Sequence, residues 1–460
     1  MNERMDGAGG ATLSLCMIVK NEAKFLPGCL ESLRDVCDQM IVVDTGSTDD
    51  TVAIARRHGA EVHTFAWCDD FAAARNASIE PATGDWILWV DADERLTPAS
   101  VAELRNLLVQ EARPVIYQVR ISSIVHGGSD RHLSTAHRLF TNGRGIRFSG
   151  RIHEQISPSA ATVGAEERHC RVLLDHLGYD DRDAELQSSK GARNRRLLER
   201  MAKENPRSAY AHYTLGQHYS LSGEHRKALR SLESARRLKQ FDTPMTAAML
   251  NSMGEIHLKL ENVAEARRMA EESRRLLPRQ VGAYYLLYRV AVAGGEDDRA
   301  LSALERLLER NALLERSGTD LSTDVVIDPL KIHYEMGMIL QRMERSEEAL
   351  MHFERVLRVH PGEASVLERV VSIYLKGGRL AEAERHLQAL VRLDDGNSGY
   401  GDLLGTVLIK QSKFGEAISV YERLVEARPD NVAGVKRLAG LYAKVGDLDK
   451  ARGLLAVLNG

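Results

Sequence analysis

Apolar and polar residues follow two different patterns along the chain. In the first part, segments typical of strands occupy residues 13–19, 39–43, 61–65, 86–90 and 114–122, and the runs at 13–19 and 86–90 are the most apolar. Helical patterns lie between them, at residues 26–36, 48–58, 71–79 and 98–109. Buried strands that alternate with helices are typical of a parallel sheet covered on both faces. We therefore expect an α/β domain with a mostly parallel sheet, and Ser47 and Thr48 are expected to cap its second helix.

From residue 207 the pattern is helical throughout and repeats every 34 residues. Alanines recur at this interval, at Ala266 and Ala300 and at Ala349, Ala383, Ala417 and Ala451. Glycines precede four alanines by twelve residues, at Gly216, Gly254, Gly337 and Gly405, and prolines follow three by twelve, at Pro278, Pro361 and Pro429. Small residues let two helices cross closely, and proline ends a helical hairpin. The pattern resembles the tetratricopeptide repeat, with about seven copies.

These two patterns predict the domain organisation. We expect a disordered tail at residues 1–10, an α/β domain at 11–180, a helical linker at 181–206 and an all-α repeat solenoid at 207–460. The 460 residues are 43% hydrophobic and 28% charged, which excludes a disordered polymer.

Charge and cysteine content narrow the choice of partners and compartment. The formal net charge is −3, so there is no general attraction towards nucleic acid or an anionic membrane. No apolar run approaches the ~20 residues of a membrane span. The first ten residues lack the apolar core of a signal peptide, and the five cysteines form no CxxC pair. A cytoplasmic protein without a membrane span is expected.

Acidic residues follow two of the predicted strands. Asp44 follows the second strand, and the triplet Asp91-Ala92-Asp93 follows the run 86–90. Ligands of such sheets bind beyond the carboxyl ends of the strands. Two carboxylates separated by one residue can converge on a hard divalent cation, Mg²⁺ or Mn²⁺, that also binds phosphate oxygens. The alternative is an acidic turn that only caps the next helix.

Four segments in this order resemble the family 2 glycosyltransferases. They are LCMIVKNE at 15–22, IVVDTGSTDDT at 41–51, FAAARNAS at 71–78 and GDWILWVDADE at 84–94. The resemblance covers about residues 12–180 and implies a GT-A fold, a nucleotide-sugar donor and inversion at the anomeric carbon. One departure is Thr45, where many members of the family have a second acid.

Three further segments are similar to a bacterial subgroup fused to tetratricopeptide repeats. They are RLF at 138–140, SGRIHEQ at 149–155 and HLGY at 176–179. This subgroup includes the S-glycosyltransferases that modify glycocin-type peptides.

The resemblance implies roles at the donor site. Asp44 would contact uracil or ribose, Arg75 the base or a phosphate, and Asp91 the ribose or a metal-bound water. Asp93 would bind the cation directly and so take part in catalysis. The remaining donor-binding residues would be Val19, Asn21, Glu22 and Ala92. The alternatives are a helix-capping role for Asp44 and an ion pair of Arg75 with Asp69 or Asp70.

Transfer with inversion also needs a base and positive charge on the leaving diphosphate. Glu154 is the candidate base, and its alternative is a salt bridge to Arg151 or Arg138. His153 and His176 are candidates to complete the metal site, because imidazole suits Mn²⁺. For either histidine the alternative is a structural role.

Three functions remain open. The first is sugar transfer from a nucleotide sugar, expected to be UDP-linked, to a Cys, Ser or Thr side chain of a peptide or protein bound with the help of the repeats. The second is transfer to a saccharide or cell-envelope acceptor. The third is a repeat scaffold with an inactive transferase domain. The long concave surface of a repeat array favours the first.

The last predicted helix carries leucines at helical spacing, namely Leu448, Leu454, Leu455 and Leu458. Repeats of this kind stack apolar faces on one another, and no amphipathic cap follows this segment. We therefore expect a homodimer through the C-terminal repeats, most simply a two-fold one.

Overall fold

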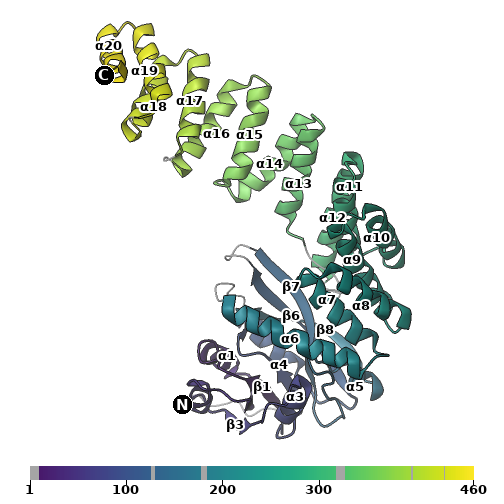
Figure 1. Ribbon diagram of the computed structural model, residues 1–460. Coiled ribbons are helices and arrows are strands. Elements are labelled where there is room, and N and C mark those ends of the chain that lie inside the picture. The colour runs from purple at the N-terminus through teal and green to yellow at the C-terminus, as the bar shows by residue number, and fades with distance from the viewer. Residues whose placement is uncertain are drawn as a thin grey trace. The chain divides into compact units, whose positions relative to one another are not determined.

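The computed structural model describes residues 10–125, 130–177, 184–317, 327–394, 397–428 and 430–459. The chain divides into two compact units (Figure 1). The first comprises Met1–Glu296 with Glu305–Ile327, and the second Asp297–Leu304 with Asp328–Gly460. The predicted tail at 1–9, residues 178–179 of the HLGY segment and the boundary at 180–181 lie outside the described residues.

A single sheet forms the centre of the α/β domain. Its described strands are β1 (Leu13–Val19), β2 (Gln39–Asp44), β3 (Glu61–Thr64), β4 (Trp86–Trp89), β5 (Glu94–Leu96), β6 (Val115–Val125), β7 (Asp130–Thr141) and β8 (Glu166–His176). Their order in the sheet is β3-β2-β1-β4-β7-β6-β8-β5. Strands β1 to β4 are parallel, as the apolar runs predict.

The other half of the sheet is more antiparallel than the sequence pattern predicts. Strand β7 runs antiparallel to both β4 and β6, and β5 runs antiparallel to β8. Only β6 and β8 form a parallel pair in this half. The sheet is therefore mixed, and strands β5, β7 and β8 were not predicted.

Helices cover both faces of the sheet. They are α1 (Leu26–Leu33), α2 (Thr51–Arg57), α3 (Phe71–Ile79), α4 (Val101–Leu107) and α5 (Ser157–Thr162). Helices α1, α2 and α4 share one hydrophobic core with Leu15 and Met17 of β1. Helices α3 and α5 share the other core with Cys16. Consecutive residues of β1 thus point into opposite cores, which explains why its sequence is apolar except for Ser14.

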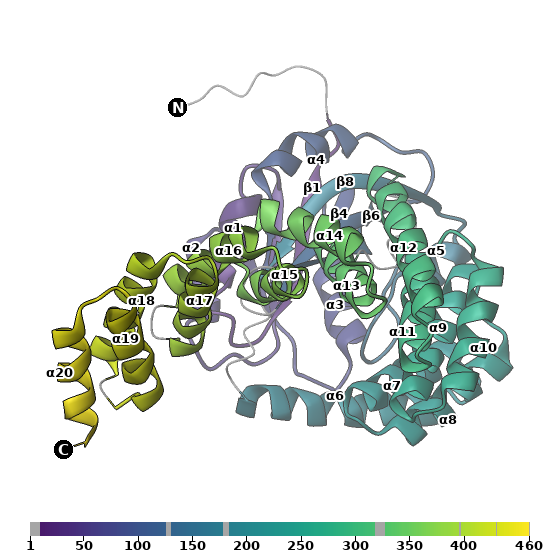
Figure 2. The same ribbon diagram turned by 90° about the horizontal axis from the view of Figure 1, so that it is seen from above.

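A long helix, α6 (Ala184–Glu204), leads from the sheet domain into the repeats. The described helices that follow include six hairpins: α7 (Ala209–Leu221) with α8 (His225–Leu238), α9 (Thr243–Lys259) with α10 (Val263–Leu276), α13 (Pro329–Arg342) with α14 (Ser346–Val359), α15 (Ala364–Lys376) with α16 (Leu380–Leu393), α17 (Ser398–Lys410) with α18 (Phe414–Ala427), and α19 (Val432–Lys444) with α20 (Leu448–Asn459). Helices α11 (Val281–Ala293) and α12 (Asp297–Ser317) follow the second of these hairpins in the chain. Figure 2 shows α6 running into α7 within the first unit.

The repeated small residues lie where paired helices cross. A Cβ atom at Gly405 would lie 2.5 Å from the ring of Tyr421, and one at Gly337 would lie 2.6 Å from the ring of Phe353. The repeated alanines Ala349 and Ala417 on the partner helices are fully buried. The 34-residue period is therefore a period of close helix crossings.

Of the leucines predicted to form the dimer surface, the structure describes three side chains, and two of these are exposed. Leu448 is 52% exposed and Leu455 is 43% exposed, whereas Leu454 packs against the core of the last hairpins. The side chain of Leu458 lies outside the described residues. Dimerisation stays a prediction.

None of the described helices combines the length and the apolar character that crossing a bilayer requires.

We predict opposite effects of alanine at two glycines of the last hairpins. Gly405→Ala would drive a methyl group into the Tyr421 ring and cost about 1–3 kcal/mol of stability. Gly440→Ala meets no atom within 4 Å, so the better helix propensity of alanine would stabilise by up to about 1 kcal/mol. Thermal unfolding followed by circular dichroism compares the two. Equal stabilisation by both substitutions would contradict the role of Gly405 in helix crossing.

Candidate active site

The loops after β1 and β2 bind each other at the carboxyl edge of the sheet. Asn21 adopts the left-handed conformation, with φ of 57°. Its Oδ1 accepts a hydrogen bond from the Thr48 N–H (2.7 Å), and its own N–H donates to the Ser47 Oγ (2.9 Å). Ser47 and Thr48 therefore do not cap α2 as predicted, because Asn21 binds them. The helix begins at Thr51 instead.

The other residues of this edge that were predicted to bind the donor hold the same two loops. The buried Asp44 carboxylate accepts hydrogen bonds from the N–H groups of Gly46 and Ser47, so it stabilises its own turn. The Val19 carbonyl accepts from both the N–H and the hydroxyl of Thr45, each at 3.0 Å. The Glu22 N–H donates to the Thr51 hydroxyl.

Arg75 of α3 joins two carboxylates that are far apart in the sequence. Its Nη2 lies 2.6 Å from the Asp91 Oδ1, and its Nε lies 2.5 Å from the Glu154 Oε1. The side chains of Arg75 and Glu154 are only 7% and 9% exposed, so this is a buried pair.

The alternative partners considered for these two residues bind elsewhere. Asp70 accepts a hydrogen bond from the Ala73 N–H and caps α3, while Asp69 pairs with Arg196 of α6. Arg151 pairs with Glu204 rather than with Glu154.

Arg138 of β7 extends the chain of ion pairs. Its Nη2 lies 2.6 Å from the Glu94 Oε1 and 3.2 Å from the Asp91 Oδ2. The Asp91 N–H donates to the other oxygen of Glu94, Oε2, at 2.9 Å. Glu94 and Arg138 thus fix both the backbone and the side chain of Asp91. Neither was among the predicted site residues, although both belong to the segments that carry the family resemblance.

Trp89 supports both guanidinium groups. The guanidinium carbon of Arg138 lies 3.5 Å from the Trp89 ring centroid, and that of Arg75 lies 4.1 Å from it. Arg75 Nη1 and both Nε and Nη1 of Arg138 are buried, with no hydrogen-bond partner among the described residues. The negative face of the indole ring compensates part of this loss through cation–π attraction.

The ion pairs shift the pKa values of the acids in opposite directions. Burial would raise the pKa of Asp91, but Arg75 and Arg138 outweigh it and hold this pKa well below its ordinary value. Burial raises the pKa of Glu94 to about 7, although Arg138 opposes the rise. The two arginines thus favour the charged form of Asp91, whereas burial favours the neutral form of Glu94.

Asp93 meets His176 across the edge of the sheet. Strand β5 pairs with β8 so that Glu94 lies opposite His176, and the His176 Nε2 lies 3.2 Å from the Asp93 Oδ2. The hydrogen bond to Asp93 raises the pKa of His176, and burial opposes it. The Nδ1 of His176 lies 3.2 Å from the Ser123 hydroxyl.

The expected metal-binding trio of Asp93, His153 and His176 is not assembled. Across the described ranges, no three His, Cys, Asp or Glu side chains are grouped so that they could hold a metal ion. His153 lies in a tight loop with φ of 52°, its side chain is exposed, and its carbonyl accepts a hydrogen bond from Tyr210 of α7. The structure thus brings together two of the three predicted ligands.

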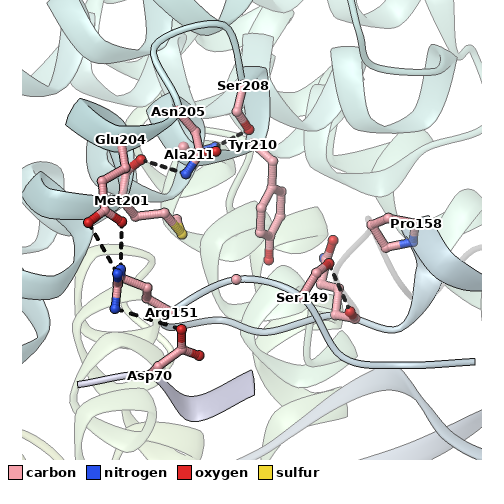
Figure 3. Close-up of a pocket in the computed structure, with 12 residues that line it drawn as sticks. Asp70, Ser149, Arg151, Pro158, Met201, Glu204, Asn205, Ser208, Tyr210 and Ala211 are labelled. Carbon is pink, nitrogen blue, oxygen red and sulfur yellow. Dashed lines mark hydrogen bonds and ion pairs between the residues drawn. The ribbon is translucent and has the colours of Figure 1, made fainter. Parts of the chain in front are cut away.

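A cavity of about 390 Å³ lies beside the loop at 149–155 that carries Glu154. It is lined by Asp70, by Ser149–Arg151, and by residues of α6 and α7 that include Glu204 and Tyr210. Figure 3 shows Tyr210 pointing from α7 towards this loop, and Arg151 between Asp70 and Glu204. Glu154 is not among the lining residues, and its carboxylate binds Arg75.

We predict that Arg138→Met destabilises the fold by about 3–5 kcal/mol, because it leaves Glu94 as an unpaired buried charge. Adding Glu94→Gln should restore part of the loss. The exposed pair of Arg34 with Glu31 supplies the control, since Arg34→Met should cost less than about 1 kcal/mol. Urea unfolding of the four proteins measures these differences. A single substitution at Arg138 no more harmful than that at Arg34 would show that the buried pair is not stabilising.

Comparisons with known proteins agree with this division of the chain. Residues 14–164 match the family described as Glycosyl transferase family 2, and residues 334–398 and 408–459 match the tetratricopeptide repeat. A TPR repeat-containing protein of Synechococcus elongatus is 39% identical over 240 residues, which are 51% of this chain and 58% of that protein. The SPbeta prophage-derived glycosyltransferase SunS of Bacillus subtilis is 28% identical over 230 residues, 49% of this chain and 53% of that protein.

The chain thus spans about half the length of these curated relatives. Among solved structures, the C-terminal part of a TPR repeat-containing protein from Cytophaga hutchinsonii is 14% identical with a TM-score of 0.43, over 54% of this chain and 95% of that one. The chain therefore joins a glycosyltransferase family 2 domain to tetratricopeptide repeats.

Proposed function

We propose that this chain is an inverting glycosyltransferase that moves a sugar from a UDP-linked donor to a peptide or protein side chain. The observation that carries the proposal is the chain of ion pairs from Glu154 through Arg75 and Asp91 to Arg138. It lies inside the matched family segment and next to the carboxyl ends of the parallel strands, where ligands of such sheets bind.

The donor would lie across the bound loops after β1 and β2. Val19, Asn21, Glu22 and Asp44 would form the nucleotide end of this site, because hydrogen bonds already fix their backbone positions. Arg75, Asp91 and Ala92 would form the end nearer the diphosphate. A site fixed before the donor binds loses less conformational freedom on binding.

A divalent cation, Mg²⁺ or Mn²⁺, would complete the site. Asp93 and His176 would hold it, since carboxylate oxygen and imidazole nitrogen are suitable ligands for Mn²⁺. The acids Asp91, Asp93, Glu94 and Glu154 outnumber the two arginines Arg75 and Arg138, so this cluster alone does not favour a dianionic diphosphate. When bound, the cation would supply the missing positive charge on the leaving group.

The transfer itself is a single displacement at the anomeric carbon. The acceptor atom forms its bond to this carbon as the bond to the diphosphate oxygen breaks, and the electron pair leaves with the diphosphate. Glu154 would take the proton of the acceptor. A cysteine acceptor would need little help, because a thiol with a pKa of about 8.5 is already partly ionised at neutral pH.

The proposal of a peptide or protein acceptor rests on the repeats. Stacked repeats form an extended surface that suits a polymer better than a small sugar. A saccharide or cell-envelope acceptor is the alternative outcome of the test below. The complete set of buried ion pairs argues against an inactive domain, because unused buried charges only reduce stability.

A screen of nucleotide sugars tests the activity. The full-length protein is incubated with each donor and Mn²⁺, and the release of nucleoside diphosphate is measured, first alone and then with cysteine-containing peptides or with oligosaccharides. We expect release from UDP sugars that peptides accelerate. If only oligosaccharides accelerated the release, the acceptor would be a saccharide and not a peptide. If no donor released nucleoside diphosphate, the proposed function would be wrong.

We predict that Asp93→Asn and excess chelator each abolish most of this release, since both would remove the cation from the diphosphate. The fold should persist, because the Asp93 side chain is 25% exposed and bonds only with His176 among the described contacts. Asp35→Asn, at an exposed position of the same domain, is the control. Full activity in excess chelator would exclude the metal role of Asp93.

We predict that Glu154→Gln lowers kcat for a serine or threonine acceptor by about 10²–10⁴-fold, the usual contribution of a general base, and much less for a cysteine acceptor. UDP binding, measured by calorimetry, should stay within about threefold, since the amide oxygen still accepts from Arg75. The exposed Glu80→Gln serves as the matched control. If UDP affinity fell in parallel with kcat, Glu154 would belong to the nucleotide site and another group would be the base.

A further inference from the structure

The loop that carries Glu154 is held by α3 on one side. Ser149 and Gln155 pair with each other through two backbone hydrogen bonds and close the loop. The Phe71 N–H at the start of α3 donates to the Arg151 carbonyl at 2.9 Å, and Arg75 binds the Glu154 carboxylate. Helix α3 therefore fixes the two ends of the segment 151–154.

The other side of the loop is held by helices outside the predicted transferase domain. Arg151 forms two hydrogen bonds with the Glu204 carboxylate of α6, at 2.6 and 3.1 Å. Ile152 is 5% exposed and shares one hydrophobic core with Met201 of α6 and Ala211 of α7. The first repeat helix is thus packed against the loop within one compact unit.

Between these two sides, Tyr210 of α7 binds the peptide unit next to Glu154. Its hydroxyl donates to the His153 carbonyl at 3.0 Å. That carbonyl belongs to the planar peptide unit that ends at the Glu154 Cα, so fixing it fixes the direction from which the Glu154 side chain starts. His153 has φ of 52°, a conformation that non-glycine residues adopt only when their surroundings impose it.

We propose that Tyr210 is a positioning residue of the transferase site, and that the first repeat helix completes this site by holding Glu154 in place. The inference rests on the proposed function of Glu154 as the base. Without the hydroxyl of Tyr210, the peptide unit between His153 and Glu154 is free to rotate out of its strained conformation. The carboxylate then spends less time where it can take the acceptor proton.

The test compares Tyr210→Phe with a matched tyrosine of another repeat. Tyr284 lies near the start of α11, and its hydroxyl donates to the Pro278 carbonyl at 3.3 Å, so Tyr284→Phe removes the same kind of bond away from the transferase motifs. The probe is UDP-glucose, or the donor that the screen identifies. For Tyr210→Phe we expect kcat to fall about five- to tenfold, the usual effect of one hydrogen bond.

Further measurements show whether Tyr210→Phe lowers kcat by disturbing the fold or by releasing Glu154 from its position. The donor KM of Tyr210→Phe should stay at the wild-type value. Each substitution removes one hydrogen bond, so both thermal midpoints should fall slightly, whereas kcat should fall only in Tyr210→Phe. In the Glu154→Gln background, Tyr210→Phe should have no further effect on kcat, because its influence passes through Glu154.

The outcomes distinguish the two proposals. A wild-type protein that releases no nucleoside diphosphate from any donor overturns the proposed function itself. An active wild type with an unchanged kcat in Tyr210→Phe overturns the role of Tyr210. An equal loss of kcat in the Glu154→Gln background, or in Tyr284→Phe, also overturns it.

Discussion

The site depends on one buried guanidinium group, that of Arg75, held between Asp91 and Glu154 against the face of Trp89. A buried charge that loses its partner is costly, so every element that carries one of these groups must keep its place. The pairing therefore connects α3, the end of β4 and the loop at 149–155. Arg138 extends the same requirement to β7 through Asp91 and Glu94.

The parallel half of the sheet was predictable because its central strands β1 and β4 are largely buried and mostly apolar, and helical patterns separate the strands. In the other half, β6 alone of the described strands was predicted. Strand β7 mixes polar and apolar residues without strict alternation, and β5 has only three residues, too few for a periodic signal. The start of α2 was also misplaced, since Ser47 and Thr48 are typical capping residues that here bind Asn21, a residue 26 positions away from Ser47.

The site shows the same division between local and long-range information. The family resemblance named Arg75, Asp91 and Glu154, yet only the folded chain shows that Arg75 bonds to both acids, one of them 79 residues away. Arg138 and Glu94 were missed because charged residues are usually exposed, and burial cannot be read from residue type. His153 was expected beside Asp93, but the left-handed turn at this residue, which the sequence does not reveal, sends its carbonyl to Tyr210.

The division between transferase and repeats is clear in the sequence and less so in the packing. Residue 207 marks the start of the 34-residue period, but Ile152 of the transferase domain is buried in the same core as Leu197 and Tyr213 of the helices that follow. In a repeat array each hairpin is stabilised by its neighbours, and the first hairpin here has the transferase loop as one of them. The order of that loop therefore depends on the same contacts that begin the array, and Glu154 lies at the point where the two kinds of structure meet.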